Sequence, residues 1–427
     1  MKSCGFDSVS GFHSYPIGKV LLAFLLVVGP LSACGGNKHL AKHPHRQHYV
    51  DFTRKALPKI PRSVTHAEFA RVNRDPHRDL VFLVSDGDGR QKILVLFGDG
   101  KGKFTLRDSG QKIAEKDEKI IFFSLGDLDG DRAEDLITVQ TVQGKTTARI
   151  LFNNKKGYFY KKEPYSMPLI RSGMERVELI DIDQDRDLDL FFTGRDVKNL
   201  NGNSNKRQAQ LHINNGKGEF QDQTRVLWPP VPPGIVAASF ADYDGDQVRD
   251  AFLVYGNGQN RMLLNNSLGK FTDVTRSALP AIKDQSTHAD WADFDGDGDN
   301  DLLVVNRSMD EKYRSLPGET TYFLENDGRG KFKKKSHKYF PTRPAHRVYL
   351  LDANGNGIAD VLILGQDGVH FMHGGGKWRF SVETDRRLPR FKKYREMAFG
   401  DADGDGFLDL IAIDASGRAR LWINRVD

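Results

Sequence analysis

Cysteine is nearly absent from this sequence. Only Cys4 and Cys34 occur among 427 residues, so no cysteine follows residue 34. The long remainder therefore has no disulfide to hold it together and no thiol to act as a nucleophile. Disulfide-rich scaffolds and cysteine-dependent enzymes are excluded for that part of the chain, and its stability must come from another source.

The signatures of several common enzyme classes are missing as well. The sequence contains no Gly-x-Ser-x-Gly elbow, no His-Glu-x-x-His motif and no Walker phosphate loop. We therefore expect no catalytic residue and no organic cofactor, and a binding protein rather than an enzyme.

Long hydrophobic runs are scarce too. The run over residues 20–28 follows Lys19 and is short for a membrane span. Gly29 and Pro30 come next, then Leu-Ser-Ala-Cys ending at Cys34, which is the order of a secretory signal with a small-residue cleavage site.

Leu-Ser-Ala-Cys resembles the lipobox of bacterial lipoproteins. That resemblance implies a signal peptide over residues 1–33, and a lipid on Cys34 that anchors the chain to a membrane. Gly35 stands where Asp would signal inner-membrane retention, so the resemblance favours the outer membrane, facing the periplasm or the cell surface. Ordinary cleavage nearby is the alternative. Residues 34–48 are polar and predict a solvated tether, because no apolar pattern would hold their histidines as metal ligands.

One acidic loop dominates what the sequence does contain. Residues 293–302 read Asp-Phe-Asp-Gly-Asp-Gly-Asp-Asn-Asp-Leu, with carboxylates at loop positions 1, 3, 5, 7 and 9. Like charges at this density disfavour a compact loop unless a hard cation lies among them, and Ca²⁺ takes roughly six to eight oxygen ligands. The apolar residues 302–305 that follow predict a buried strand. No helix signal flanks the loop, so we interpret it as a calcium loop between two strands.

The same loop recurs along the chain. Its position-9 aspartate is found seven times, at intervals of 49 to 61 residues: Asp79, Asp135, Asp189, Asp250, Asp301, Asp360 and Asp409. Each is followed by an apolar run, and hairpin segments with turn residues and an aromatic come about 20 to 31 residues later, as in the Asn-Gly and Gly-Lys-Gly turn at residues 214–220. Each period holds about four short strands, so we predict an all-β fold, a seven-bladed β-propeller over residues 49–427.

The two ends of the chain predict how the ring closes. Residues 49–58 match residues 271–280, which precede an interior loop, whereas the chain stops after residues 421–424 with an outer strand still missing. We expect the N-terminal segment to supply that strand and so to remove the open edges of the last blade.

These loops resemble the FG-GAP/VCBS repeat, to which the propeller of integrin alpha subunits belongs. The resemblance covers residues 49–427 and implies about five to six Ca²⁺ sites, with side-chain ligands at positions 1, 3, 5 and 9 and a further ligand at position 7. The five complete sets are Asp127, Asp129, Asp131, Ala133 and Asp135; Asp181, Asp183, Asp185, Asp187 and Asp189; Asp242, Asp244, Asp246, Val248 and Asp250; Asp293, Asp295, Asp297, Asp299 and Asp301; Asp401, Asp403, Asp405, Phe407 and Asp409.

Two loops depart from the pattern. The sixth has Asp352, Asn354, Asn356, Ile358 and Asp360, and its lower charge predicts weaker binding. The first begins with Arg71, a cation at position 1 that argues against calcium there. The alternative for any loop is a turn-like connector without an ion.

The charge balance indicates the chemistry of a partner. The formal net charge is +6, and many of the 57 acidic residues lie in the loops, so a calcium-loaded propeller would present a basic surface. Such a surface attracts lipopolysaccharide phosphates, acidic glycans or lipid headgroups, or it is simply solvated. Without a recognition helix or an aromatic–basic motif, we expect no nucleic-acid partner. We expect a monomer.

The strand before each loop should be the innermost of its blade. Two and four residues before position 1, the side chains are apolar in every copy and should pack between blades, whereas those three and five before should face the central channel. Five charged or titratable residues then stand at the channel mouth as candidate ligand contacts: His66, Arg176, His288, Arg347 and Glu396. A water-filled channel with satisfied charges is the alternative. Two inserts, residues 194–208 and 306–320, are secondary candidates.

These features favour a calcium-stabilised, lipid-anchored binding or adhesion module of the bacterial cell envelope, for a protein or an anionic glycan. Some polysaccharide lyases use similar calcium-bearing propellers, so an enzyme acting at the channel mouth is a second hypothesis. A structural partner in outer-membrane assembly is a third.

Overall fold

The computed structural model describes residues 47–86, 88–108, 110–115, 118–161, 169–171, 173–194, 209–306, 321–335, 345–365, 368–388 and 394–426. The predicted signal peptide, Cys34, most of the predicted tether and nearly all of both inserts lie outside these ranges. Within the described ranges, no helix is both long and apolar enough to cross a membrane.

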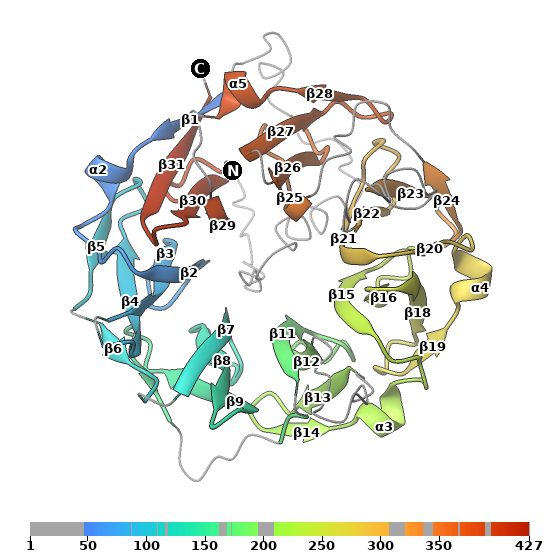
Figure 1. Ribbon diagram of the computed structural model, residues 1–427, viewed down its shortest axis with the longest axis horizontal. Coiled ribbons are helices and arrows are strands. Elements are labelled where there is room, and N and C mark those ends of the chain that lie inside the picture. The colour runs from blue at the N-terminus through green and yellow to red at the C-terminus, as the bar shows by residue number, and fades with distance from the viewer. Residues whose placement is uncertain are drawn as a thin grey trace, which may run out of the picture.

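Seven antiparallel sheets form a closed ring, as the sequence predicted (Figure 1). Blade one holds β2 (Val64–Ala70), β3 (Asp79–Ser85), β4 (Gln91–Gly98) and β5 (Phe104–Leu106), with β6 (Gln111–Lys112) also paired to β4. Blade two holds β7 (Glu118–Gly126), β8 (Asp135–Val142), β9 (Lys145–Asn153) and β10 (Phe159–Tyr160). Blade three holds β11 (Met174–Ile180), β12 (Asp189–Gly194), β13 (Gln210–Asn214) and β14 (Phe220–Asp222).

The other blades repeat this order. Blade four holds β15 (Ile235–Ala241), β16 (Asp250–Tyr255), β18 (Arg261–Asn265) and β19 (Phe271–Asp273), while β17 (Gly258–Gln259) pairs with β20 (Lys283–Asp284). Blade five holds β21 (Ser286–Ala292), β22 (Asp301–Asn306), β23 (Tyr322–Asn326) and β24 (Phe332–Lys335). Blade six holds β25 (Ala345–Leu351), β26 (Asp360–Gly365), β27 (Gly368–Gly374) and β28 (Phe380–Val382).

Blade seven confirms the predicted closure. It holds β29 (Tyr394–Gly400), β30 (Asp409–Asp414) and β31 (Ala419–Val426) from the C-terminal end, and its fourth strand is β1 (Gln47–Asp51). Tyr49 lies opposite Asn424 in antiparallel register, as Phe271 lies opposite Asn265 in blade four. The outer strand of the last blade therefore comes from the other end of the chain, so the two ends are joined by strand pairing and β31 is no longer an open edge.

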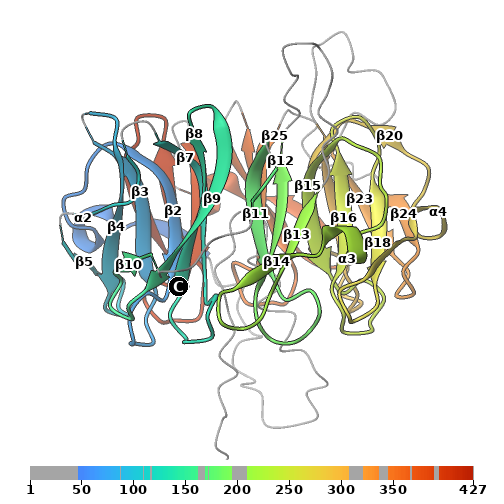
Figure 2. The same cartoon turned by 90° about the horizontal axis from the view of Figure 1, so that it is seen from below.

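The core lies between the blades rather than within one centre. The apolar residues two positions before each loop are all buried: Phe69, Leu125, Leu179, Phe240, Trp291, Leu350 and Phe399. The residues four positions before are buried as well, for example Phe123, Val177 and Met397. These residues pack in hydrophobic clusters that each contain residues of two neighbouring blades. Phe69 of blade one, for example, lies in one cluster with Ile411 of blade seven. Every blade is thus held by its two neighbours, and Figure 2 shows the strands standing side by side around the ring.

Four short helices follow outer strands. They are α2 (Thr53–Ala56), α3 (Thr224–Leu227), α4 (Thr275–Ala278) and α5 (Thr384–Arg387). In α3 the backbone N–H of Thr224 donates to Asp222 Oδ1 at 3.0 Å, and in α4 the N–H of Thr275 donates to Asp273 Oδ1 at the same distance. These aspartates satisfy an amide at the start of each turn that has no partner within it, so a single helical turn is enough to connect two blades.

Candidate metal loops and the inner ring

The position-9 aspartate of each loop is a buried hydrogen-bond acceptor. Asp135 accepts the backbone N–H of Leu128 at 3.0 Å and that of Asn153 at 2.7 Å, and Asp301 accepts those of Phe294 and Asn326 at 3.1 and 2.8 Å. The same pair of contacts recurs at Asp189. This carboxylate therefore ties the start of its loop to the end of the third strand, and it fixes the loop whether or not an ion is bound.

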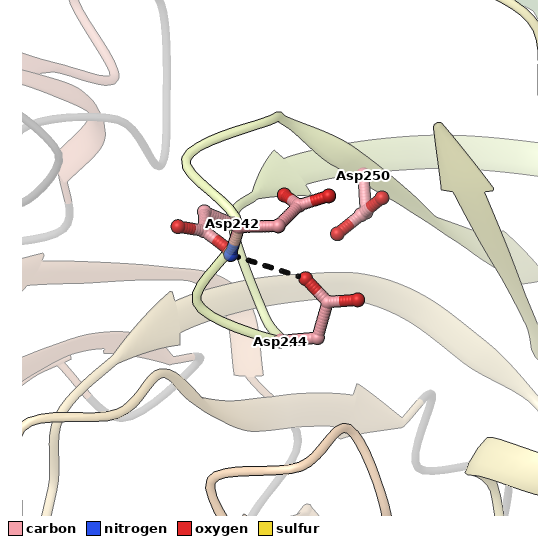
Figure 3. A group of neighbouring side chains, drawn as sticks. Asp242, Asp244 and Asp250 are labelled. Carbon is pink, nitrogen blue, oxygen red and sulfur yellow. Dashed lines mark hydrogen bonds between the residues drawn. The ribbon is translucent and has the colours of Figure 1, made fainter. Parts of the chain in front are cut away.

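Aspartates gather in the five loops that the sequence marked as complete. The groups whose carboxylate oxygens all lie within 4.8 Å of one another are Asp127, Asp129 and Asp135; Asp181, Asp183 and Asp189; Asp242, Asp244, Asp246 and Asp250; Asp293, Asp295 and Asp297; Asp401, Asp403 and Asp409. In the fourth loop, Asp242, Asp244 and Asp250 turn their carboxylates toward one another (Figure 3). Several oxygen ligands at one point, without sulfur or imidazole, are the donor set that a hard divalent cation takes.

Burial makes these groups costly to ionise without a cation. Burial, with smaller effects from neighbouring Asp244 and Asp246, raises the pKa of Asp250 to about 8, although backbone hydrogen bonds oppose the shift. Burial likewise raises the pKa values of Asp135, Asp189, Asp301 and Asp409 to about 8. A bound divalent cation would favour the charged form of each carboxylate, so the residues present fit such an ion.

Other residues of the implied ligand sets shape the loops. The position-5 side chain accepts the backbone N–H of position 7, as Asp131 does from Ala133 at 2.9 Å and Asp246 from Val248 at 2.8 Å. The same contact joins Asp185 to Asp187, Asp297 to Asp299, Asn356 to Ile358, and Asp405 to Phe407. These local turns present the position-7 residue at the edge of each loop.

The first and sixth loops differ from the other five. In the sixth, His373 Nδ1 lies 2.7 Å from Asp360 Oδ1, and Asn354 Nδ2 lies 3.3 Å from His373 Nδ1. In the first, Arg78 Nη1 lies 3.6 Å from Glu134 Oε1 of the second loop. Neither loop contributes to the acidic groups found among the described residues. In the sixth loop a basic side chain thus lies beside a carboxylate of the loop, whereas in the first loop a basic side chain pairs with a carboxylate of the next blade.

All seven innermost strands carry a β-bulge at the same place. The register shifts between Val64 and His66 in β2 and between Tyr394 and Glu396 in β29, and an equivalent shift occurs in β7, β11, β15, β21 and β25. The residue directly after the bulge is His66, Arg176, His288, Arg347 or Glu396 in five of these strands. A bulge re-aims the following side chain, so these five residues share one level of the ring.

Three of the five residues, His66, Glu396 and Arg347, form a continuous chain of ion pairs that ends at Glu68. His66 Nδ1 is paired with Glu396, which comes from the opposite end of the sequence. Glu396 Oε2 also lies 3.8 Å from Arg347 Nη1, and His66 Nε2 lies 3.5 Å from Glu68 Oε1. His288 lies close enough to Arg347 and Arg176 for both to affect its ionisation. We call these five side chains, with Glu68, the inner ring.

The pKa values of the inner ring diverge strongly. Burial would lower the pKa of His66, but Glu396 and Glu68 raise it to about 9. Burial raises the pKa of Glu68 to about 7, although His66 opposes the shift. Burial, with a smaller effect from Arg176 and Arg347, lowers the pKa of His288 to about 3. At neutral pH one histidine of the ring is therefore charged and the other is neutral.

A set of asparagines links the blades, a role that the sequence pattern did not predict. Asn214 Nδ2 donates to the carbonyl of Leu128 in blade two at 2.9 Å and to that of Leu188 in its own loop at 3.0 Å. Asn153, Asn265, Asn326 and Asn424 make the same contact to the preceding blade. The recurrence of Asn at the first hairpin position was the available signal, but it was interpreted only as part of a turn.

The FG-GAP-like repeat model matches residues 127–192, 242–304 and 352–412. A comparison with curated proteins found no match. Among solved structures, an Agrocybe aegerita lectin that recognises non-reducing terminal N-acetylglucosamine is 19% identical over 78% of this chain and 82% of that chain, with a TM-score of 0.48. The biofilm matrix protein Bap1 of V. cholerae is 11% identical over 88% and 90% of the two chains, with a TM-score of 0.40. These two similarities are too remote to carry an argument.

Proposed function

Because the chain is a seven-bladed propeller with FG-GAP-like repeats, we propose that it is a calcium-binding module that holds a protein or an anionic glycan in a bacterial cell envelope. The observation that carries this proposal is the inner ring. Charged or titratable side chains from five blades share one level there, and such convergent polar groups are typical of a binding site on a rigid scaffold.

Calcium would stabilise the blades rather than take part in ligand binding. Each of the five acidic groups lies at the loop between the first two strands of a blade. An ion there offsets the repulsion among carboxylates and thereby stabilises the folded state over the unfolded one. A chain without disulfides in its propeller gains from such a cross-link.

The placement in the envelope rests on the sequence before residue 47. The lipobox-like Leu-Ser-Ala-Cys would anchor the propeller through Cys34, and the net charge of +6 favours anionic partners. Lipid headgroups, lipopolysaccharide and acidic polysaccharides share that chemistry.

The test is a capture experiment with the full chain. The protein, purified in detergent and immobilised, is incubated with envelope extract and with an array of acidic and neutral glycans, once with Ca²⁺ and once with a chelator. We expect retention of a protein or an acidic glycan that is reduced by chelation and by the double substitution Arg347→Gln, His288→Gln. Equal retention by wild type and double variant would remove the inner ring from the proposal, and no retention at all would overturn it.

One observation favours an enzyme as a second candidate. His66 lies between Glu68 and Glu396, and the pKa of Glu68 is raised to about 7 and that of His66 to about 9, so these groups can hold and release a proton at neutral to alkaline pH. Cleavage of acidic polysaccharides that persists through purification and is lost in His66→Gln and His288→Ala would support it. An unchanged polymer length after prolonged incubation would exclude it for the substrates used.

A further inference from the structure

The hairpins between the third and fourth strands of six blades share one template. In each, a phenylalanine pairs with the last residue of the third strand: Phe104 with Gly98, Phe159 with Asn153, Phe220 with Asn214, Phe271 with Asn265, Phe332 with Asn326, and Phe380 with Gly374. The common register allows side chains of different blades to be compared position by position. The repeats thus show what the fold itself requires at each position.

The residues on either side of this phenylalanine are exposed in every one of these hairpins. In five blades both are polar: Lys103 and Thr105, Glu219 and Gln221, Lys270 and Thr272, Lys331 and Lys333, Arg379 and Ser381. In blade two they are Tyr158 and Tyr160, each 46% exposed. Five blades fold with polar residues here, so the fold requires no aromatic ring at either position.

The two tyrosines lie on one face of the strand, because residues two apart point to the same side. Phe159 between them is buried. The guanidinium of Arg107, from blade one, stacks over the ring of Tyr158 with its Cζ 4.4 Å from the ring centroid. Lys156 and Lys161 flank the tyrosines and are exposed. We call Arg107, Lys156, Tyr158, Tyr160 and Lys161 the tyrosine face.

The tyrosine face is held in place from the neighbouring blade. The backbone N–H of Phe159 donates to Gln111 Oε1 at 2.9 Å, and Gln111 Nε2 donates back to the carbonyl of Phe159. Gln111 belongs to β6, so blade one positions the strand that carries both tyrosines. A surface already ordered before binding loses little conformational entropy when a ligand arrives.

Two aspartates in this part of the described surface are paired with basic side chains. Asp108 Oδ2 lies 2.8 Å from Arg107 Nη2, and Asp131 Oδ2 lies 3.2 Å from Lys155 Nζ. Because Asp108 offsets the charge of Arg107, the positive charge of the tyrosine face comes from Lys156 and Lys161, which flank the two amphipathic rings. Aromatic rings with a polar tip cover the apolar face of a partner while their hydroxyls reach water or a polar group.

We propose that the tyrosine face binds an acidic glycan, with the two rings against sugar rings and the basic side chains against its carboxylate or sulfate groups. This inference rests on the proposed function and gives its acidic glycan a second contact surface, on the outer hairpin of blade two, in addition to the inner ring. Carboxylated and sulfated sugars share the recognised chemistry, so both are used as probes.

Residues taken from another blade allow the contribution of the tyrosine rings to be tested separately from that of positive charge. The double substitution Tyr158→Lys, Tyr160→Thr gives blade two the residues of blade four, Lys270 and Thr272. It removes both rings and adds a positive charge. For the full chain with oligogalacturonate and with a heparin-derived oligosaccharide at constant ionic strength, we expect at least about tenfold weaker binding, since aromatic contacts dominate many interfaces.

Two controls complete the experiment. Leu268→Ser removes an apolar side chain that is 72% exposed in the blade-four hairpin, and it should leave binding unchanged. A neutral oligosaccharide of equal length should bind more weakly than either acidic one. Unchanged or tighter binding by the double variant, with an unchanged melting temperature, would overturn the tyrosine face while leaving the proposed function intact. Absence of wild-type binding to both acidic probes would overturn it too, and the proposed function would then be judged by the capture of a protein partner.

Discussion

The side-chain amide of Asn153, in blade two, donates a 2.9 Å hydrogen bond to the backbone carbonyl of Val72, in blade one and 81 residues earlier. Asn214, Asn265, Asn326 and Asn424 repeat this bond to the preceding blade. In two blades a glycine takes the place of the asparagine, and a backbone N–H of the same hairpin donates to a backbone carbonyl in the loop of the preceding blade. The N–H of Gly102 donates to the carbonyl of Ala402 at 3.0 Å, and that of Lys377 to the carbonyl of Asp295 at 2.7 Å. All seven junctions between blades are thus bridged near the acidic loops.

The first prediction concerns these bridges. Asn214→Ala removes two hydrogen bonds and leaves the carbonyls of Leu128 and Leu188 buried without that partner, so we expect the free energy of unfolding to fall by about 1–3 kcal/mol. Urea denaturation followed by tryptophan fluorescence measures it. Asn215→Ala, at the exposed next position, should cost about 0.5 kcal/mol or less. Equal losses in the two variants would contradict the bridging role of Asn214.

The sequence predicted the parts of this fold that repeat. The spacing of the position-9 aspartates predicted seven blades, and the apolar residues two and four before each loop, such as Phe69 and Leu125, predicted the surfaces between blades. Residues 49–58 predicted the closure because they copy an interior segment. A repeated pattern averages over local exceptions, so its periodicity is a reliable signal.

The contacts between particular residues were beyond the sequence. Strict alternation placed His66 and Glu396 on one face, but their pairing depends on ring closure and on a bulge before each residue. His373 beside Asp360 in the sixth loop could not be anticipated, because the other blades have no histidine at its position. The tyrosine face is recognised only when equivalent positions of the six hairpins are compared, and the strand register of the structure defines those positions.

The second prediction concerns calcium at the fourth loop. Asp244→Ala removes one carboxylate from the group of four, so the variant should bind one equivalent fewer than wild type at millimolar Ca²⁺. Its melting temperature in Ca²⁺ should fall, but less than after full chelation of wild type, because the other loops still bind. Calorimetric titration and thermal melting measure these effects. The melting experiments keep Ca²⁺ at a constant millimolar concentration, because sites of this kind can have dissociation constants as high as about 10⁻⁴ to 10⁻³ M.

Asp327→Ala is the matched control for that measurement. Asp327 is an exposed aspartate of the blade-five hairpin that accepts backbone N–H groups and belongs to none of the acidic groups. Its removal should leave the calcium stoichiometry unchanged. A folded wild-type protein that takes up no Ca²⁺ at millimolar concentration would refute calcium binding altogether.

The third prediction adds a site at the sixth loop. Asn354→Asp with Asn356→Asp restores carboxylates at positions 3 and 5, beside Asp352 and Asp360, and should raise the calcium stoichiometry by one. Because His373 pairs with Asp360, the new site should bind Ca²⁺ more tightly when His373→Leu is added. An unchanged stoichiometry in the triple variant, with a native circular dichroism spectrum, would show that carboxylates alone do not make this loop a site.

The last prediction concerns the inner ring and alkaline pH. The pKa of His66 is about 9 in the folded protein and about 6.5 in an unfolded chain, so the folded state binds more protons between these values. Stability from the pair of His66 and Glu396 is fully present below about pH 6.5 and is lost as pH rises through about 9. Burial also raises the pKa of Glu68 to about 7, below the interval from pH 7.5 to 9.5, and the other groups that titrate within this interval are common to wild type and the His66→Gln variant. Over that interval wild type should lose about 1–3 kcal/mol more than His66→Gln in urea denaturation at fixed Ca²⁺, since each unit of pKa shift corresponds to about 1.4 kcal/mol. Parallel losses in the two proteins would mean that His66 is not charged in the folded ring.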